Sequence, residues 1–162
     1  MVVSTDGWTF CAQGHRHWGR AGAAGLLLHR DGPEGRELLL QHRAAWSHHG
    51  GTWGTPGGAL HADELASLGA LREVREELGL LPTDLVLGEE SIDDHGGWAY
   101  TTVLARPARK IEAGDLRLDG ESDGVAWLPL AALHEVELHP GLAASLPRLR
   151  PLLERAGTDV RD

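Results

Sequence analysis

The chain contains short apolar and β-branched runs, several of them bounded by turn signals, that are typical of β-strands. These segments lie at residues 21–29, 37–41, 53–56, 85–90, 98–105 and 125–128. Helical spacing occurs before Gly79 and again at residues 129–133 and 142–153, where Pro147 and Pro151 leave the helix ends undefined. Residues 1–20 show no regular pattern. The whole pattern predicts a single α/β domain over residues 1–162, with a mixed β-sheet and helices on both faces.

The helix before Gly79 carries three glutamates on one face: Glu73, Glu76 and Glu77. At about 100° per residue, Glu77 lies about 40° to one side of Glu73 and Glu76 about 60° to the other. The apolar positions lie nearly opposite, and they are Leu68, Leu71, Val74 and Leu78. Gly79 can adopt the left-handed conformation that ends a helix. One face is therefore expected to pack on a core while the other presents carboxylates.

Glutamates on a helix are more often a solvated surface than a site, and Arg72 and Arg75 could pair with them there. Like charges on one face repel each other, however, and contribute nothing to folding. Clustered oxygen atoms are the ligands that a hard cation such as Mg²⁺ requires. The glycine-rich run at residues 54–58 and Glu64, six residues after it, favour the metal-binding interpretation.

These residues occur at fixed spacing, and together they resemble the complete signature of the Nudix hydrolases. The matching positions are Gly58, Glu64, Arg72, Glu73, Glu76, Glu77 and Gly79, with Val74 and Leu80 at the apolar positions. The sequence departs from the common pattern at Leu65, where Ser or Thr often caps the helix. Asp63 or Glu64 is expected to cap it instead.

The resemblance implies a Nudix-type α/β/α sandwich with a loop–helix–loop catalytic motif. It also implies that Mg²⁺, or Mn²⁺, is held by Glu73, Glu76, Glu77 and the carbonyl of Gly58. Glu64 and Arg72 are expected to brace the motif. The proton of the attacking water would pass to Glu73, to Glu76 or to a carboxylate in a distal loop. Glu121 is the first choice for that distal residue, and Asp119 and Asp123 are alternatives.

Aromatic and histidine side chains outside the motif suggest how a substrate could be held. Trp53 and Trp98 could stack on a nucleobase, although core packing is the more common role of tryptophan. Trp127 is assigned to the core. His49, in the polar loop at residues 42–52, could contact phosphates or simply belong to that loop.

Charge and composition exclude several classes of function. The formal net charge of -9 argues against binding to a nucleic acid polymer, which requires a basic surface. No apolar run is long enough to span a membrane, and no secretory signal is recognised. One cysteine fits a reducing cytoplasm. Cys11, His15 and His17 lack a fourth ligand nearby and have an uncommon spacing for zinc, so no metal site is expected there.

The sequence therefore predicts a Mg²⁺-dependent pyrophosphohydrolase acting on a nucleoside diphosphate linked to another moiety. A nucleoside triphosphate, either unmodified or oxidised, is the first choice of substrate. The alternative is a non-catalytic module that binds nucleotide metabolites, although such modules often lack one of the glutamates. An isoprenoid-diphosphate isomerase is disfavoured because Cys11 is far from the motif. A homodimer is a further possibility.

Overall fold

The computed structural model describes residues 5–156, and its central element is strand β3 (Ala23–Gly32). β3 pairs in parallel with β8 (Ala99–Pro107), from Ala23 opposite Tyr100 to Leu28 opposite Ala105. It also pairs antiparallel with β4 (Gly35–Arg43) and β6 (Gly57–Ala59). The sheet is therefore mixed, as the sequence predicts.

Three further strands complete this seven-stranded sheet. β7 (Leu85–Asp94) pairs with β8 and forms one edge, while β5 (Trp53–Gly54) and β9 (Ser122–Pro129) both pair with β4. The remaining short elements are the 3-10 helices η1 (Pro82–Asp84), η2 (Ala113–Asp115) and η3 (Leu130–Glu135).

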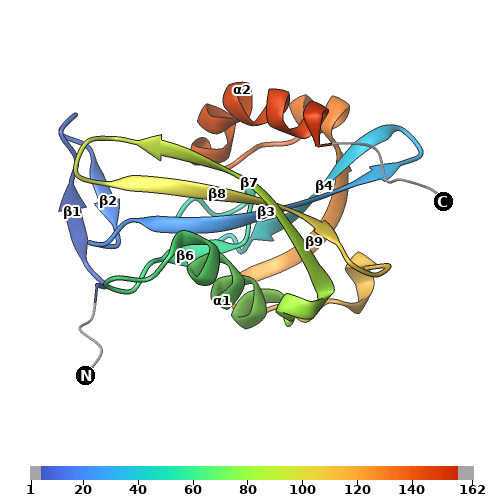
Figure 1. The fold of residues 1–162 in the computed structure, drawn as a ribbon, viewed down its shortest axis with the longest axis horizontal. Coiled ribbons are helices and arrows are strands. Elements are labelled where there is room, and N and C mark those ends of the chain that lie inside the picture. The colour runs from blue at the N-terminus through green and yellow to red at the C-terminus, as the bar shows by residue number, and fades with distance from the viewer. Residues whose placement is uncertain (1–4, 157–162) are drawn as a thin grey trace.

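One helix covers each face of the sheet (Figure 1). Helix α1 (Ala66–Leu78) buries Ala70, Val74 and Leu78 in a cluster with Leu26, Leu28 and Leu39 of the strands. Helix α2 (Pro140–Arg155) packs on the other face, in a cluster that includes Leu27, Leu38, Leu40, Leu142, Leu146, Leu149 and Leu153. Successive leucines of β3 and β4 thus point to opposite faces. The predicted α/β/α sandwich is confirmed.

Helix α1 differs in two details from the sequence expectation. Its N-cap is Leu65, and no side chain caps it. Asp63 instead has a positive φ of 60°, and Glu64 accepts a hydrogen bond from the backbone N–H of His61, so the capping role predicted for these two residues is wrong. Leu68, which was assigned to the apolar stripe, is 55% exposed because it lies on the solvent side of that stripe.

Helix α2 runs without interruption through Pro147 and Pro151. Both prolines are exposed, so the backbone carbonyls that lose an N–H partner can be hydrated. The buried leucines of α2 hold the helix against the sheet on its other side. The helix predicted to begin at Pro129 is the 3-10 helix η3, with Pro129 as its N-cap.

The N-terminal region contains a two-stranded hairpin where the sequence predicts an irregular segment. β1 (Trp8–Phe10) pairs antiparallel with β2 (Arg16–Trp18), and the rings of Trp8 and Trp18 are 5.2 Å apart across the pair. Each strand has three residues, which is too short for alternation to be recognised.

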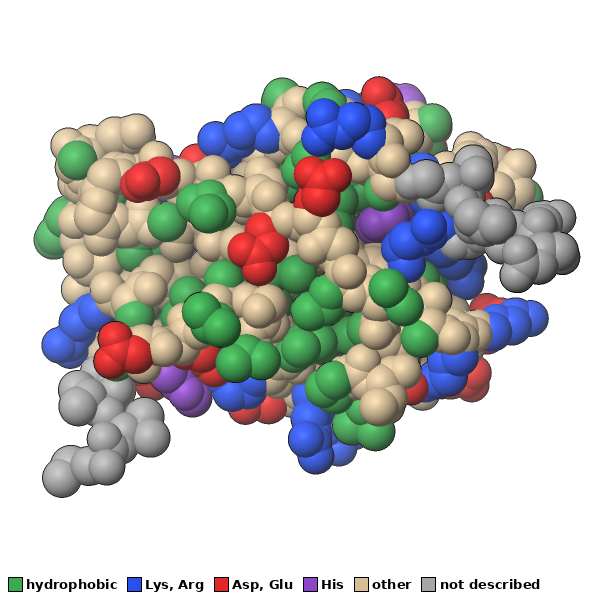
Figure 2. Space-filling view, in the orientation of Figure 1, with side chains coloured by type: hydrophobic (Ala, Val, Ile, Leu, Met, Phe, Trp, Pro, Cys, Tyr) green, Lys and Arg blue, Asp and Glu red, His purple; other side chains and the backbone are tan. Residues whose placement is uncertain are grey.

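Hydrophobic side chains are spread over the middle of the face shown in Figure 2. Val86, Leu87 and Ile92 of the edge strand β7 are among the exposed hydrophobic residues of the protein.

Among residues 5–156, no helix is long and apolar enough to cross a membrane. The suggested homodimer stays a prediction.

His29 of β3 should make the fold sensitive to acid. It is 1% exposed. Burial, with the cations Arg36 and Arg106 outweighing Asp31, lowers its pKa from 6.5 to about 4. The folded protein therefore keeps His29 neutral, while the unfolded chain protonates it below pH 6.5. Above pH 6.5 the burial of neutral His29 therefore costs no stability. As the pH falls from 6.5 toward 4, protonation of His29 in the unfolded chain lowers the free energy of unfolding by up to roughly 3 kcal/mol.

Urea unfolding between pH 4 and pH 7, followed by circular dichroism, measures this loss. The His29→Leu variant should show a flatter dependence of unfolding free energy on pH over that range, because it has no group to protonate at this position. Parallel curves for the two proteins would contradict the assignment.

Candidate active site

The loop before α1 is fastened to the helix by Arg72. Its Nε and Nη2 atoms donate to the two carboxylate oxygens of Glu64, at 3.0 and 2.8 Å. Nη1 donates to Glu73 at 2.8 Å, and Nη2 also donates to the carbonyl of Ala59 at 3.1 Å. Hydrogen bonding from Arg72 lowers the pKa of Glu64 to about 2. Glu64 and Arg72 thus form a mostly buried ion pair that joins the loop to the helix.

Glu73 and Glu77 lie against the glycine-rich loop. A side chain at Gly58 would place its Cβ 2.7 Å from the carboxylate of Glu73, so any larger residue there would displace this carboxylate. Glu77 accepts a hydrogen bond from the backbone N–H of Gly57 at 3.1 Å. Glu76 lies beside them with its side chain 60% exposed, and its carboxylate is 3.8 Å from Arg72. The three glutamates form a wall in which Glu73 and Glu77 are partly buried and Glu76 is exposed to solvent.

This wall carries more negative charge than its surroundings compensate. Burial, together with the charges of Glu73 and Asp119, raises the pKa of Glu77 to about 8. Burial also raises the pKa of Glu73, even though Arg72 opposes the shift. Carboxylates held in this way are stabilised by a nearby cation. The donor set, all of it oxygen, fits a hard divalent metal ion.

A cavity of about 360 Å³ begins at Gly57 and Gly58, next to the glutamate wall. Trp98 and His49, both predicted to bind substrate, line it. It is also lined by residues that no sequence pattern marks as substrate-binding: Arg43, Tyr100, His139 and His17. These residues belong to elements far apart in the sequence, so only the fold reveals their proximity.

The walls of the cavity are fixed by specific contacts. The Trp98 ring stacks on His17, with centroids 4.0 Å apart, and its Nε1 donates to the carbonyl of Gly19 at 2.9 Å. The hydroxyl of Tyr100 is 3.2 Å from that of Thr55. His139 caps α2 by accepting the N–H of Gly141 at 3.0 Å through Nδ1.

In the distal loop, Asp119 lies within electrostatic reach of the wall, since its charge contributes to the raised pKa of Glu77. Glu121 is exposed, and its backbone N–H donates to Asp119 at 3.2 Å. Asp123 is paired with His42.

The family model described as the NUDIX domain matches residues 19–149. The chain belongs to the Nudix family. The glutamate signature of the family is complete in this chain at residues 58–80. It lies in the loop–helix–loop that the resemblance implied.

Two similar Nudix relatives have names that state an activity. A Mycobacterium tuberculosis protein, named provisionally as 8-oxo-dGTP diphosphatase 3, is 43% identical over 152 residues, which cover 90% of this chain and 69% of that protein. A Bifidobacterium longum protein named nucleoside triphosphate pyrophosphatase/Nudix hydrolase fusion protein is 40% identical over 158 residues. The match covers 94% of this chain but only 32% of the fusion protein, so the chain spans about one third of its length.

Solved Nudix structures agree with the fold. The Nudix hydrolase RenU of M. smegmatis superposes with a TM-score of 0.84 at 39% identity, covering 96% of this chain and 99% of that one. The Ap4A hydrolase of C. elegans superposes with a TM-score of 0.64 at 21% identity, covering 83% and 98% of the two chains. At that identity, the second likeness concerns the fold alone.

Trp53 lies elsewhere than its predicted role suggests. It does not line the cavity of this Nudix domain; its partly buried ring packs against the leucine cluster beneath α2. Its backbone N–H donates to Glu137, and its carbonyl accepts from His139, at 2.9 and 2.7 Å. Trp127 packs in the cluster beneath α1, as assigned, and donates to Ile111 at 3.0 Å.

Proposed function

We propose that the protein is a Mg²⁺-dependent pyrophosphohydrolase that cleaves an oxidised purine nucleoside triphosphate. The observation that carries the proposal is the wall of three glutamates, Glu73, Glu76 and Glu77, which lies against the glycine-rich loop that lines the cavity. Water would break a phosphoanhydride bond and leave a shorter nucleotide together with phosphate or pyrophosphate. The names of the relatives support this class of substrate.

The glutamate wall and the Gly58 carbonyl would hold the divalent ion, Mg²⁺ or Mn²⁺. The ion, when bound, supplies positive charge to the phosphates and lowers the pKa of water. Arg43 lines the same cavity and is close enough for its charge to act on Glu77. We assign it to the phosphate chain together with His49, because a guanidinium matches phosphate oxygens. The base would lie against Trp98, which lines the same cavity.

The proton of the attacking water would pass to a carboxylate beside the wall. We favour Asp119 over Glu121 because the charge of Asp119 contributes to the raised pKa of Glu77. Glu73 and Glu76 stay alternatives within the motif. Asp119→Asn and Glu121→Asn variants, compared by single-turnover kinetics at saturating Mg²⁺, separate the two distal residues.

A phosphate-release screen tests the proposed substrate class. It compares 8-oxo-dGTP, dGTP, nucleotide sugars, dinucleotides and dinucleoside polyphosphates, each with Mg²⁺, with Mn²⁺ and with chelator. We expect kcat/KM for 8-oxo-dGTP to exceed that for dGTP by about tenfold or more, the scale of discrimination that one changed polar group can give. Turnover confined to a nucleotide sugar or a dinucleotide would overturn the substrate class. Tight nucleotide binding by calorimetry, with no product, would establish the binding-module alternative.

The proposed reaction also indicates the partners and the location of the protein. The substrate is a small nucleoside diphosphate derivative, and no nucleic acid polymer or membrane takes part. A cytoplasmic location fits the single cysteine, Cys11, which is buried and unpaired in the structure.

A further inference from the structure

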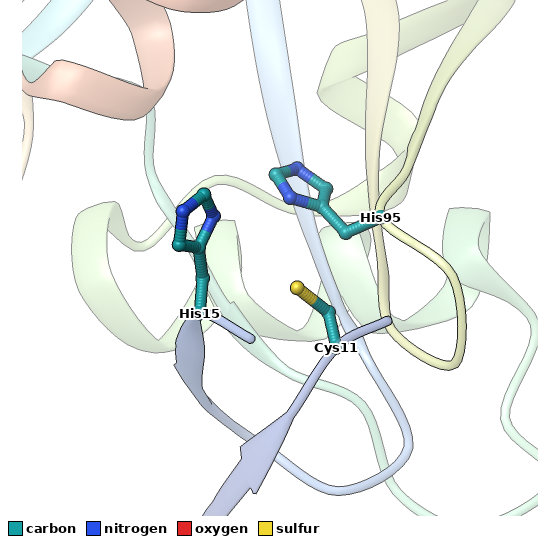
Figure 3. A group of neighbouring side chains, drawn as sticks. All are labelled: Cys11, His15 and His95. Carbon is teal, nitrogen blue, oxygen red and sulfur yellow. The ribbon is translucent and has the colours of Figure 1, made fainter. Parts of the chain in front are cut away.

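Three metal-binding side chains meet at the end of the molecule that carries the β1–β2 hairpin. Cys11 and His15 lie in the turn of this hairpin, and His95 lies in the turn between β7 and β8. Their ligand atoms all lie within 4.8 Å of one another. Figure 3 shows the Cys11 sulfur pointing toward the space between the two imidazole rings. The third ligand thus comes from a distant part of the sequence, which explains why the cysteine–histidine pattern alone looked incomplete.

His95 is oriented as a metal ligand usually is. Its Nδ1 atom is buried and has no hydrogen-bond partner among residues 5–156. Its Nε2 atom lies 3.0 Å from Oδ2 of Asp93, and Oδ1 of Asp93 lies 2.9 Å from Arg148. A carboxylate bonded to one imidazole nitrogen fixes the ring and leaves the other nitrogen available as a lone pair. The unpartnered buried nitrogen therefore needs a ligand to offset its burial.

The two turns are already held in contact. The backbone N–H of Ala12 donates to the carbonyl of Gly96 at 2.6 Å, and the N–H of Cys11 donates to the carbonyl of His15 at 3.0 Å. Gly96 has a φ of 76°, and a Cβ there would lie 2.5 Å from the side chain of Ala12. Only glycine permits this approach. The ligands are therefore brought together by the backbone before any ion binds.

We propose that Cys11, His15 and His95 form a Zn²⁺ site that joins the β1–β2 hairpin to the β7–β8 turn. A thiolate and two imidazoles are the donors that Zn²⁺ prefers, whereas Mg²⁺ requires oxygen. The site is therefore chemically separate from the glutamate wall. Three protein ligands leave one tetrahedral position, which water fills, since His15 is exposed to solvent.

The site has a structural consequence for the cavity. The hairpin carries His17, which stacks on Trp98 and lines the cavity with it. His95 lines the same cavity and lies 4.8 Å from His17 between ring centroids. A metal ion that ties the two turns together therefore also fixes this wall of the substrate cavity.

Metal analysis of the purified protein tests the site without any measurement of turnover. The chain is freed of metal, mixed with ZnSO₄, passed through a desalting column and analysed by plasma mass spectrometry. We expect about one Zn²⁺ per wild-type chain, and its loss in Cys11→Ser and in His15→Ala. His15 is exposed, so its replacement should leave the fold intact. His134→Ala, an exposed histidine of η3, is the matched control and should retain the ion.

Two further measurements fix the identity of the ligands. Co²⁺ bound to the wild-type protein should show the charge-transfer absorption of a thiolate–cobalt bond, which Cys11→Ser should lack. Zn²⁺ should raise the Tm of the wild type but not that of Cys11→Ser. Glu77→Gln should bind Zn²⁺ as the wild type does, which separates this site from the glutamate wall. Zinc binding by Cys11→Ser equal to that of the wild type, or no binding by the wild type, would overturn the proposal.

Discussion

The Glu77→Gln variant is expected to lose about three orders of magnitude in kcat at saturating Mg²⁺. Glu77 lies deepest in the glutamate wall, and its raised pKa reflects a buried charge that only a nearby cation can stabilise. A metal ion contributes several kcal/mol to the stabilisation of charge in phosphoryl transfer. At 1.36 kcal/mol per factor of ten, loss of that contribution corresponds to about 10³-fold.

Stability measurements distinguish this loss from damage to the fold. Glutamine can still accept the N–H of Gly57 through its amide oxygen, and it removes a carboxyl group whose burial beside Glu73 and Asp119 costs stability. Without Mg²⁺, the variant should therefore be at least as stable as the wild type. The rise in Tm that Mg²⁺ gives to the wild type should disappear in the variant.

Glu34→Gln is the matched control for this experiment. Glu34 is an exposed glutamate in the turn between β3 and β4. Its replacement should change neither kcat nor the effect of Mg²⁺ on Tm. Full activity of Glu77→Gln would rule out its assignment as a metal ligand.

Replacing Arg72 by alanine should destabilise the protein by about 3–5 kcal/mol, the usual cost of removing one partner from a buried ion pair. Arg72 donates to Glu64, to Glu73 and to the carbonyl of Ala59. Without it, two mostly buried carboxylates lose their cation. Urea unfolding followed by circular dichroism at neutral pH measures the change.

A double-mutant cycle assigns that loss to the ion pair. Arg72→Ala combined with Glu64→Gln should cost less than the sum of the two single replacements, because the second removes the charge left unpaired by the first. Arg75→Ala is the control on the same helix: Arg75 is exposed, and a change there should stay within about 0.5 kcal/mol. Additive losses in the cycle would show that Arg72 acts independently of Glu64.

The sequence predicted the fold well wherever an element was long or bounded by strong turn signals. The strands β3 and β4 and the helix α1 lie where the sequence predicts them, although Leu68 of the predicted apolar stripe is exposed. The β1–β2 hairpin was missed, since each of its strands has three residues. The continuity of α2 through Pro147 and Pro151 was also unreadable, because it depends on which side of the helix faces water.

The residues of the site also fall into those that the sequence could predict and those that only the fold brings together. The motif could be found from sequence because its residues lie within one loop and one helix, where spacing determines which side chains share a face. Arg43 and His139 approach the motif only through the folded chain, and no local pattern marks them, whereas the sequence offered Asp119 only as one of three candidates. His95 is the clearest example: it completes a cysteine–histidine cluster from a turn far along the chain.

The parallel pairing of β3 with β8 also bears on the order in which the molecule folds. Residue 23 pairs with residue 100, so the loop that this pairing closes contains the whole glutamate motif and the helix that bears it. Closing a long loop costs chain entropy before its contacts compensate, so such pairing forms late and folding is slow. A nascent chain would therefore acquire hydrolytic competence only after this long-range pairing has closed the sheet around the motif.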